Sequence, residues 1–219
     1  MLRRGYIERQ IEALGLAIAQ IVGLKDRGSL AEAAHELREA GKRFTGMDTF
    51  ALTRLSDESL LSFLSSSDEP EPGRYILAAT ILREHAELLE LQGQPDVARG
   101  ARRKALTLLI EAMMLGDWFR TKERLSTVQS LLEQLQDDVL PPSMNRRLFR
   151  YFEAIGSYGR AEDALYELRN DDEPDWSAEA AAFYHRLVGL ADKDLEHGGL
   201  PRDEILQGMK DASAKVARR

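Results

Sequence analysis

The chain of 219 residues contains no cysteine. Disulfide bonds, thiol nucleophiles and thiolate metal sites are therefore excluded, and a chain that needs no disulfides fits a reducing compartment. We accordingly expect a cytoplasmic protein. The composition fits a folded globular chain, because 43% of the residues are hydrophobic and 31% are charged, unlike the composition of disordered proteins.

The sequence also lacks any apolar run of the roughly 20 residues that a helix needs to cross a bilayer, so we expect no membrane partner. Its N-terminus has one feature of a secretory signal, since Arg3 and Arg4 precede a partly apolar stretch that ends at residues 17–19. Glu8 and Glu12 interrupt that stretch, and the helical pattern of apolar residues continues beyond it. Secretion is therefore not the expected outcome.

An excess of positive charge is absent as well. The formal net charge of −7 and the isoelectric point near 5.3 do not favour nucleic acid or an anionic membrane as the main partner. Basic residues gather at 99–104 and 146–150, but the N-terminal region, where helical DNA-binding regulators carry their reading helix, is apolar and alanine-rich. We interpret the basic clusters as solvated helix faces and expect no nucleic-acid partner.

Motifs that carry catalysis or metal binding are missing. Glu32 and His35 have the spacing of a di-iron helix bundle, but such a site needs a second pair and further carboxylates, and Asp194 with His197 is the only candidate to assist. No zinc-protease, nucleophile-elbow or phosphate-loop motif occurs. We predict no catalytic residue, no metal and no cofactor, and a protein that is not an enzyme.

Helical periodicity is what the sequence does contain. Apolar residues recur at helical spacing through most of the chain, and no segment shows the alternation of a strand. We predict an all-α fold of about 9–11 helices in a single domain over residues 1–219. The stretch at 65–73 contains two prolines and three acidic residues without periodicity, which makes it a mobile loop or a boundary within that domain.

Several helix limits can be predicted from the pattern. We expect a first helix over residues 2–24, a central helical hairpin over 74–92 and 96–115, and a long helix over 176–196. Further helices are expected to begin at capping residues, which are Ser29 (with Glu32 in a capping box), Asp48, Ser56, Asp117 (before Trp118 on the same helix) and Ser143.

Three turns share one pattern, in which glycine is followed two residues later by a large residue and five residues later by alanine. They are Gly28 to Ala33, Gly93 to Ala98 and Gly156 to Ala161. Glycine suits the turn, the large residue fills the mouth of a hairpin, and alanine lets two helices cross closely. The spacing between successive glycines is close to twice the roughly 34-residue period of a helical repeat.

This pattern resembles the tetratricopeptide repeat, and the resemblance implies antiparallel hairpins stacked as a right-handed array. The chain departs from the consensus at Arg102, where a large apolar residue is expected, at Ile110, where proline is usual, and at Leu168, where alanine is usual. The ends of the chain, at residues 6–15 and 199–204, resemble a bacterial family of small helical proteins that has no assigned activity. That second resemblance implies a bacterial protein and contributes no catalytic residues.

A tetratricopeptide-like array would present a groove lined by the first helix of each hairpin. The register of the repeats directs seven polar side chains into this groove, namely Thr80, Arg83, Glu87, Glu90, Arg146, Arg150 and Glu153. Arginine and glutamate together would suit a charged peptide segment of a partner protein. The alternative is that these charges pair with one another and bind nothing.

The predicted function is therefore a non-enzymatic module for protein–protein interaction or assembly. The alternative is a ligand-sensing regulator or an enzyme with an apolar pocket between helices, and a closed cavity with convergent polar groups would favour it over an open groove.

The first helix has a broader apolar face than a surface helix usually carries. Its stripe consists of Tyr6, Ile7, Ile11, Leu14 and Ile18. One interpretation is a core position covered by the rest of the chain, and the other is the contact face of a homodimer.

Overall fold

The structure is a computed structural model that describes residues 2–65, 70–170 and 176–216. These residues form twelve α-helices and one 3-10 helix and contain no strand, which confirms the predicted all-α class. The chain divides into two compact units, residues 1–138 and 139–219. A single domain over the whole chain stays a prediction.

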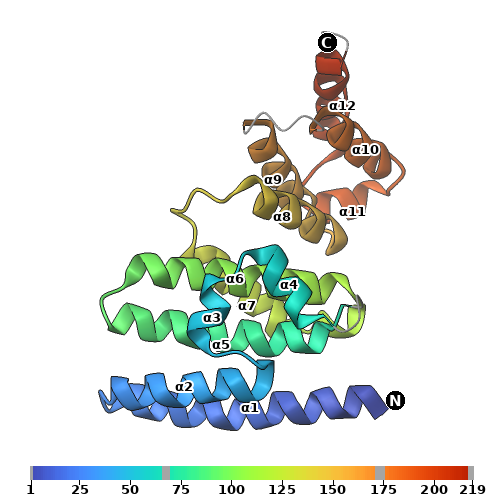
Figure 1. Ribbon diagram of the computed structural model, residues 1–219. Helices are drawn as coiled ribbons and strands as arrows, with labels where there is room; N and C mark the ends of the chain where they lie inside the picture. The colour runs from blue at the N-terminus through green and yellow to red at the C-terminus, as the bar shows by residue number, and fades with distance from the viewer. Residues whose placement is uncertain (1, 66–69, 171–175, 217–219) are drawn as a thin grey trace. The chain divides into compact units, whose positions relative to one another are not determined.

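The first unit is organised around one helical hairpin, to which a second hairpin and four further elements are added (Figure 1). Its elements are α1 (Leu2–Asp26), α2 (Leu30–Thr45), α3 (Thr49–Arg54), α4 (Asp57–Leu64), α5 (Pro72–Leu91), α6 (Pro95–Met114), the 3-10 helix η1 (Asp117–Phe119) and α7 (Lys122–Gln134). Helix α5 contacts α1, α2, α3, α4 and α6. It is therefore buried over most of its circumference, as expected of a helix that is apolar on nearly every side.

The second unit contains five helices: α8 (Pro142–Ala154), α9 (Tyr158–Asn170), α10 (Trp176–Val188), α11 (Asp192–His197) and α12 (Arg202–Val216). Helices α8 and α9 form a hairpin, and α10 packs on α12 and on α9. Aromatic rings fill the core between them. Phe149 and Phe183 meet edge to face with ring centroids 5.3 Å apart, a geometry that the ring quadrupoles favour.

Glycine shapes the three predicted hairpin turns as expected. Gly28, Gly93 and Gly156 have φ angles of 75°, 73° and 76°, in the left-handed region that favours a residue without a Cβ atom. In each turn the next amide donates to the carbonyl five residues before it, at 2.9 Å, which closes the preceding helix. The turn at Gly199 repeats this geometry between α11 and α12.

Alanine occupies each hairpin crossing. Ala33, Ala98 and Ala161 are fully buried, which confirms the burial expected of alanine at a hairpin crossing. We expect Ala98→Leu to lower the free energy of unfolding by about 1–3 kcal/mol, because the added atoms have no space between α5 and α6. Urea denaturation followed by circular dichroism measures the loss. Val97→Leu, at the exposed neighbouring position, is the matched control, and equal stability of the two variants would contradict the crossing geometry.

The regular stacking of a tetratricopeptide array stays a prediction. The short helices α3 and α4 stand in sequence between the first two hairpins and pack on α5 and α6. Residues 66–69 of the loop at 65–73 lie outside the described residues. The helices on either side of that loop, α4 and α5, contact each other within the first unit.

Several predicted helix limits were wrong. The helix expected over 176–196 ends at Val188, because Gly189 and the extended backbone of Ala191 (φ −72°, ψ 147°) separate α10 from α11. Such breaks raise the helix count above the 9–11 that we expected. Helix α8 begins at Pro142, which suits a first helical position, and therefore starts before Ser143.

The predicted caps give a mixed result. Asp48 and Ser56 accept hydrogen bonds from the amides of Ala51 and Ser59, as N-terminal caps do. Ser29 precedes α2 without a capping hydrogen bond from its side chain, so the capping box was wrong. Asp117 and Trp118 belong to η1 rather than to α7, which begins five residues later and is capped by Thr121.

Candidate binding surfaces of the first unit

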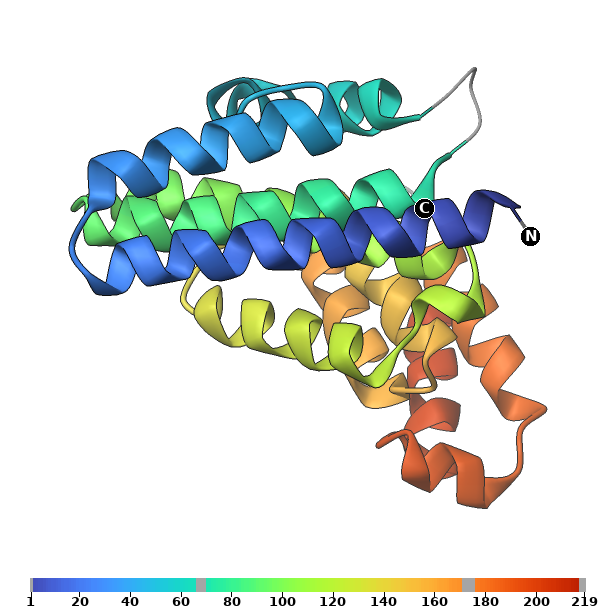
Figure 2. The same ribbon diagram turned by 90° about the horizontal axis from the view of Figure 1, so that it is seen from below.

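Three of the predicted groove residues line two hollows of the first unit, which have volumes of about 480 and 100 Å³. The two linings share Arg83, Glu123 and Thr127, so the hollows belong to one surface region. The lining residues come from α1, α5, α6 and α7, whose backbones are drawn in Figure 2. We call this region the polar groove and define it by Thr80, Arg83 and Glu87 of α5 and Glu123, Ser126, Thr127, Ser130 and Gln134 of α7. Both walls thus carry charges, since Glu123 and Arg124 lie on α7, and the α7 wall also presents hydroxyl and amide groups.

A buried ion pair lies behind this groove. The ammonium of Lys25, near the end of α1, donates to Glu84 at 2.8 Å and to Glu87 at 2.6 Å. The side chains of Lys25 and Glu84 are buried, whereas that of Glu87 is half exposed. Burial lowers the pKa of Lys25, but the hydrogen bonds and charges of both glutamates outweigh it, so the pKa lies above its ordinary value.

Arg83 keeps hydrogen-bonding capacity in the groove. Its nearest carboxylate, that of Glu84, is 3.6 Å away and accepts a shorter bond from Lys25. Thr80 uses its hydroxyl within α5, where it donates to the carbonyl of Ile76. Arg83 is therefore the strongest donor that α5 presents to the polar groove.

Glu90, the fourth residue predicted for the central hairpin, pairs across the hairpin instead. Its carboxylate accepts a hydrogen bond of 2.6 Å from the guanidinium of Arg102 on α6. This contact also explains why arginine stands at a position where the repeat consensus has a large apolar residue. The stem of Arg102 packs on the hairpin while its head pairs at the edge.

The three groove residues predicted on α8 pair within the second unit. Glu179 of α10 lies 3.4 Å from the guanidinium of Arg146 and 4.0 Å from that of Arg150. Glu153 accepts two hydrogen bonds, of 2.6 and 2.8 Å, from Arg186, which also lies on α10. These three residues are thus paired with side chains of α10, and their role in a groove stays a prediction.

The apolar stripe of α1 is only partly accessible. Leu14 is 2% exposed and belongs to the core of the first unit, which is the intrachain cover that the sequence offered as an alternative. Tyr6 is 54% exposed, and Ile7, Ile11 and Ile18 are half buried. The homodimer stays a prediction.

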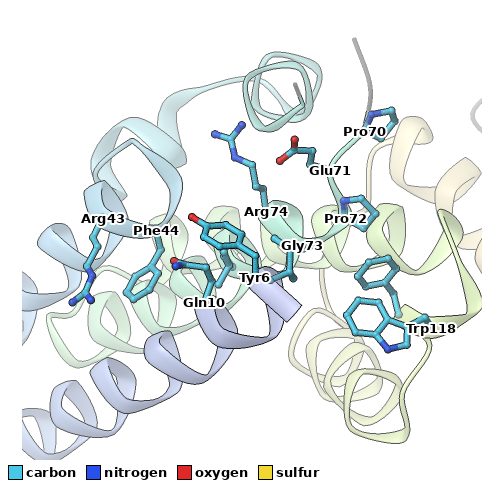
Figure 3. A pocket seen from close by; sticks show the side chains of 13 residues that line it. Tyr6, Gln10, Arg43, Phe44, Pro70, Glu71, Pro72, Gly73, Arg74 and Trp118 are labelled. Carbon is cyan, nitrogen blue, oxygen red and sulfur yellow. The ribbon is translucent and has the colours of Figure 1, made fainter. Parts of the chain in front are cut away.

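Another hollow, which we did not predict, lies at the start of α5 and has a volume of about 660 Å³. Figure 3 shows Arg43 and Phe44 at one end, Trp118 at the other, and Tyr6 and Gln10 of α1 between them. We call it the aromatic pocket; it is lined by Tyr6, Ile7, Gln10, Arg43, Phe44, Pro70, Glu71, Pro72, Gly73, Arg74, Leu77, Trp118 and Phe119.

Close packing forms the floor of the aromatic pocket. A Cβ atom on Gly73 would lie 2.6 Å from the side chain of Ile7, so glycine at this position is what allows α1 to cross the start of α5. The rings of Trp118 and Phe119 meet edge to face, with centroids 4.5 Å apart. The sequence signal that could indicate this site is the pair of aromatic residues at 118 and 119, directly after Gly116 and Asp117.

Two arginines lie at the pocket. The guanidinium of Arg43 lies 5.1 Å from the centroid of the Phe44 ring, and that of Arg74 lies 5.6 Å from the Phe63 ring and donates to the carbonyl of Thr45 at 3.2 Å. Within the described residues, neither arginine forms an ion pair with a carboxylate.

Two searches for other kinds of site gave negative results for the described part of the chain. It contains no group of three or more histidine and acidic side chains that could hold a metal ion. None of its helices is both long and apolar enough to cross a membrane.

The fold and these surfaces define an all-α protein built from helical hairpins, with the polar groove and the aromatic pocket on its first unit. The chain belongs to DUF6483, a family of unknown function, whose model matches residues 1–217. A comparison with curated proteins and one with solved structures found no match.

Proposed function

We propose that the protein is a non-enzymatic binding module that receives a charged peptide segment of a partner protein in the polar groove. The observation that supports this proposal is that Thr80, Arg83 and Glu87 line, together with polar side chains of α7, two hollows that share Arg83, Glu123 and Thr127. Arrays of helical hairpins commonly use such surfaces for recognition rather than for chemistry. The absence of cysteine supports a cytoplasmic setting and the net charge of −7 a protein partner, and a bacterial origin is what the resemblance of the chain ends implies.

Arg83 is the residue that we assign to recognition. A carboxylate of the partner would accept two parallel hydrogen bonds from its guanidinium, which gives both strength and orientation. Across the groove, the hydroxyls of Ser126 and Ser130 are exposed and suited to the peptide backbone. Glu87 and Glu123 add negative charge beside Arg83, so the preferred segment alternates acidic with basic or polar residues.

A library of displayed peptides panned against the full-length protein tests this proposal. We expect enriched peptides that contain an acidic residue and whose affinity falls by about tenfold or more in Arg83→Glu, because a charge-assisted pair is replaced by repulsion. Arg83→Gln should give a smaller loss in the same direction.

Arg38→Glu is the matched control, since Arg38 is exposed on α2 and outside the groove. Circular dichroism of each variant shows whether the fold is kept. No enrichment, or peptides that bind the parent and both Arg83 variants with equal affinity, would overturn the proposal.

A further inference from the structure

We propose that the aromatic pocket is a binding site for a small anionic molecule with an aromatic or branched apolar body. This inference goes beyond the peptide groove, because it concerns a different hollow and a different class of ligand. The pocket volume of about 660 Å³ lies within the roughly 300–1,000 Å³ typical of small-molecule sites.

The walls of the pocket select for an apolar body. Tyr6, Phe44, Trp118 and Phe119 present ring surface from three different elements, α1, α2 and η1. An exposed tyrosine and a half-buried tryptophan beside two prolines form an apolar concavity at the protein surface. A flat or branched hydrocarbon group would displace water from these rings at little conformational cost, because aromatic side chains have few rotatable bonds.

The charges at the pocket select for an anion. Arg43 and Arg74 contribute two positive charges and Glu71 one negative charge, so the pocket is positive in a chain whose net charge is −7. Both guanidiniums lie over phenylalanine rings, which hold them in place without using all of their N–H donors. A carboxylate or sulfonate group would accept hydrogen bonds from those donors, and Gln10 supplies an amide between Phe44 and Tyr6 (Figure 3).

Two fluorescent probes separate the apolar requirement from the anionic one. They are 8-anilinonaphthalene-1-sulfonate and N-phenyl-1-naphthylamine, which share the same ring system but differ in the sulfonate. We expect the full-length protein to bind the anionic probe at least about fivefold more tightly than the neutral one, since each charge-assisted hydrogen bond adds affinity.

Variants assign the binding to this pocket. Arg43→Gln should weaken the anionic probe about threefold or more and leave the neutral probe unchanged, and adding Arg74→Gln should bring the two affinities together. Trp118→Ala should weaken both probes, because it removes a shared wall. Arg38→Gln, outside the pocket on α2, is the control that keeps both affinities.

Energy transfer from tryptophan places the bound probe. The chain has two tryptophans, Trp118 and Trp176, and Trp176→Phe leaves Trp118 as the single donor, so transfer to the bound probe should persist in that variant. Equal affinities of the two probes for the parent, equal weakening of both by Arg43→Gln, or loss of transfer in Trp176→Phe would each overturn the inference. So would the failure of both probes to bind. None of these results bears on the peptide groove, which the panning experiment tests separately.

Discussion

Replacement of Lys25 by alanine is expected to lower the free energy of unfolding by about 3–5 kcal/mol, which is the usual cost of leaving a buried charge without its partner. The charge left behind is that of Glu84, whose side chain is 4% exposed and which accepts its short hydrogen bond from Lys25. Arg83 can compensate only in part, because its guanidinium is 3.6 Å away and points into the groove region. Urea denaturation at neutral pH measures the loss.

Two further variants separate burial from charge. Glu87→Gln removes the half-exposed partner of the same lysine and should cost less than about 1 kcal/mol. The double variant Lys25→Met with Glu84→Leu should recover most of the stability, because an apolar pair of similar volume leaves no buried charge. If Lys25→Ala is no more costly than Glu87→Gln, the pair is not buried as described.

Acid should destabilise the first unit through His85. Burial lowers the pKa of this histidine from 6.5 to about 4, so between these values the unfolded chain binds a proton that the folded protein does not. Stability is therefore complete above the unfolded pKa of 6.5 and falls as the pH decreases towards 4. Linkage predicts a loss of about 2 kcal/mol between pH 7 and pH 5.

His85→Gln is the control for this effect, because carboxylates also change their protonation in acid. The difference in unfolding free energy between the parent and His85→Gln should change by about 2 kcal/mol between pH 7 and pH 5. A difference that is independent of pH would contradict the burial of a neutral imidazole on α5.

The hairpins could be predicted from the sequence because their determinants are local. Gly93 and Ala98 are separated by five residues, and their roles follow from backbone geometry and side-chain size alone. Of the residues that line the polar groove, those on α5 could be predicted from the sequence and those on α7 could not. Thr80, Arg83 and Glu87 follow from helical spacing, whereas their partners on α7 depend on how a separate helix packs.

Contacts between distant segments could not be predicted. The pairing of Lys25 with Glu84 requires the packing of α1 on α5, which no local pattern indicates. Gly41 is needed for a similar reason, because a Cβ atom there would lie 2.7 Å from the carbonyl of Met47 and would obstruct the turn that follows α2. The aromatic pocket was missed for the same reason, since its walls come from four segments.

The glycines of the second unit differ in whether a second mutation could rescue their loss. A Cβ atom on Gly159 would lie 2.6 Å from the backbone oxygen of Gly199, and the Gly159 amide donates to the carbonyl of Gly198 at 2.9 Å. At Gly208 the obstacle is instead the ring of Tyr184, a side chain that another substitution can shorten. A genetic screen for suppressors should therefore return changes at Tyr184 for alanine at position 208, but only reversion to glycine at position 159.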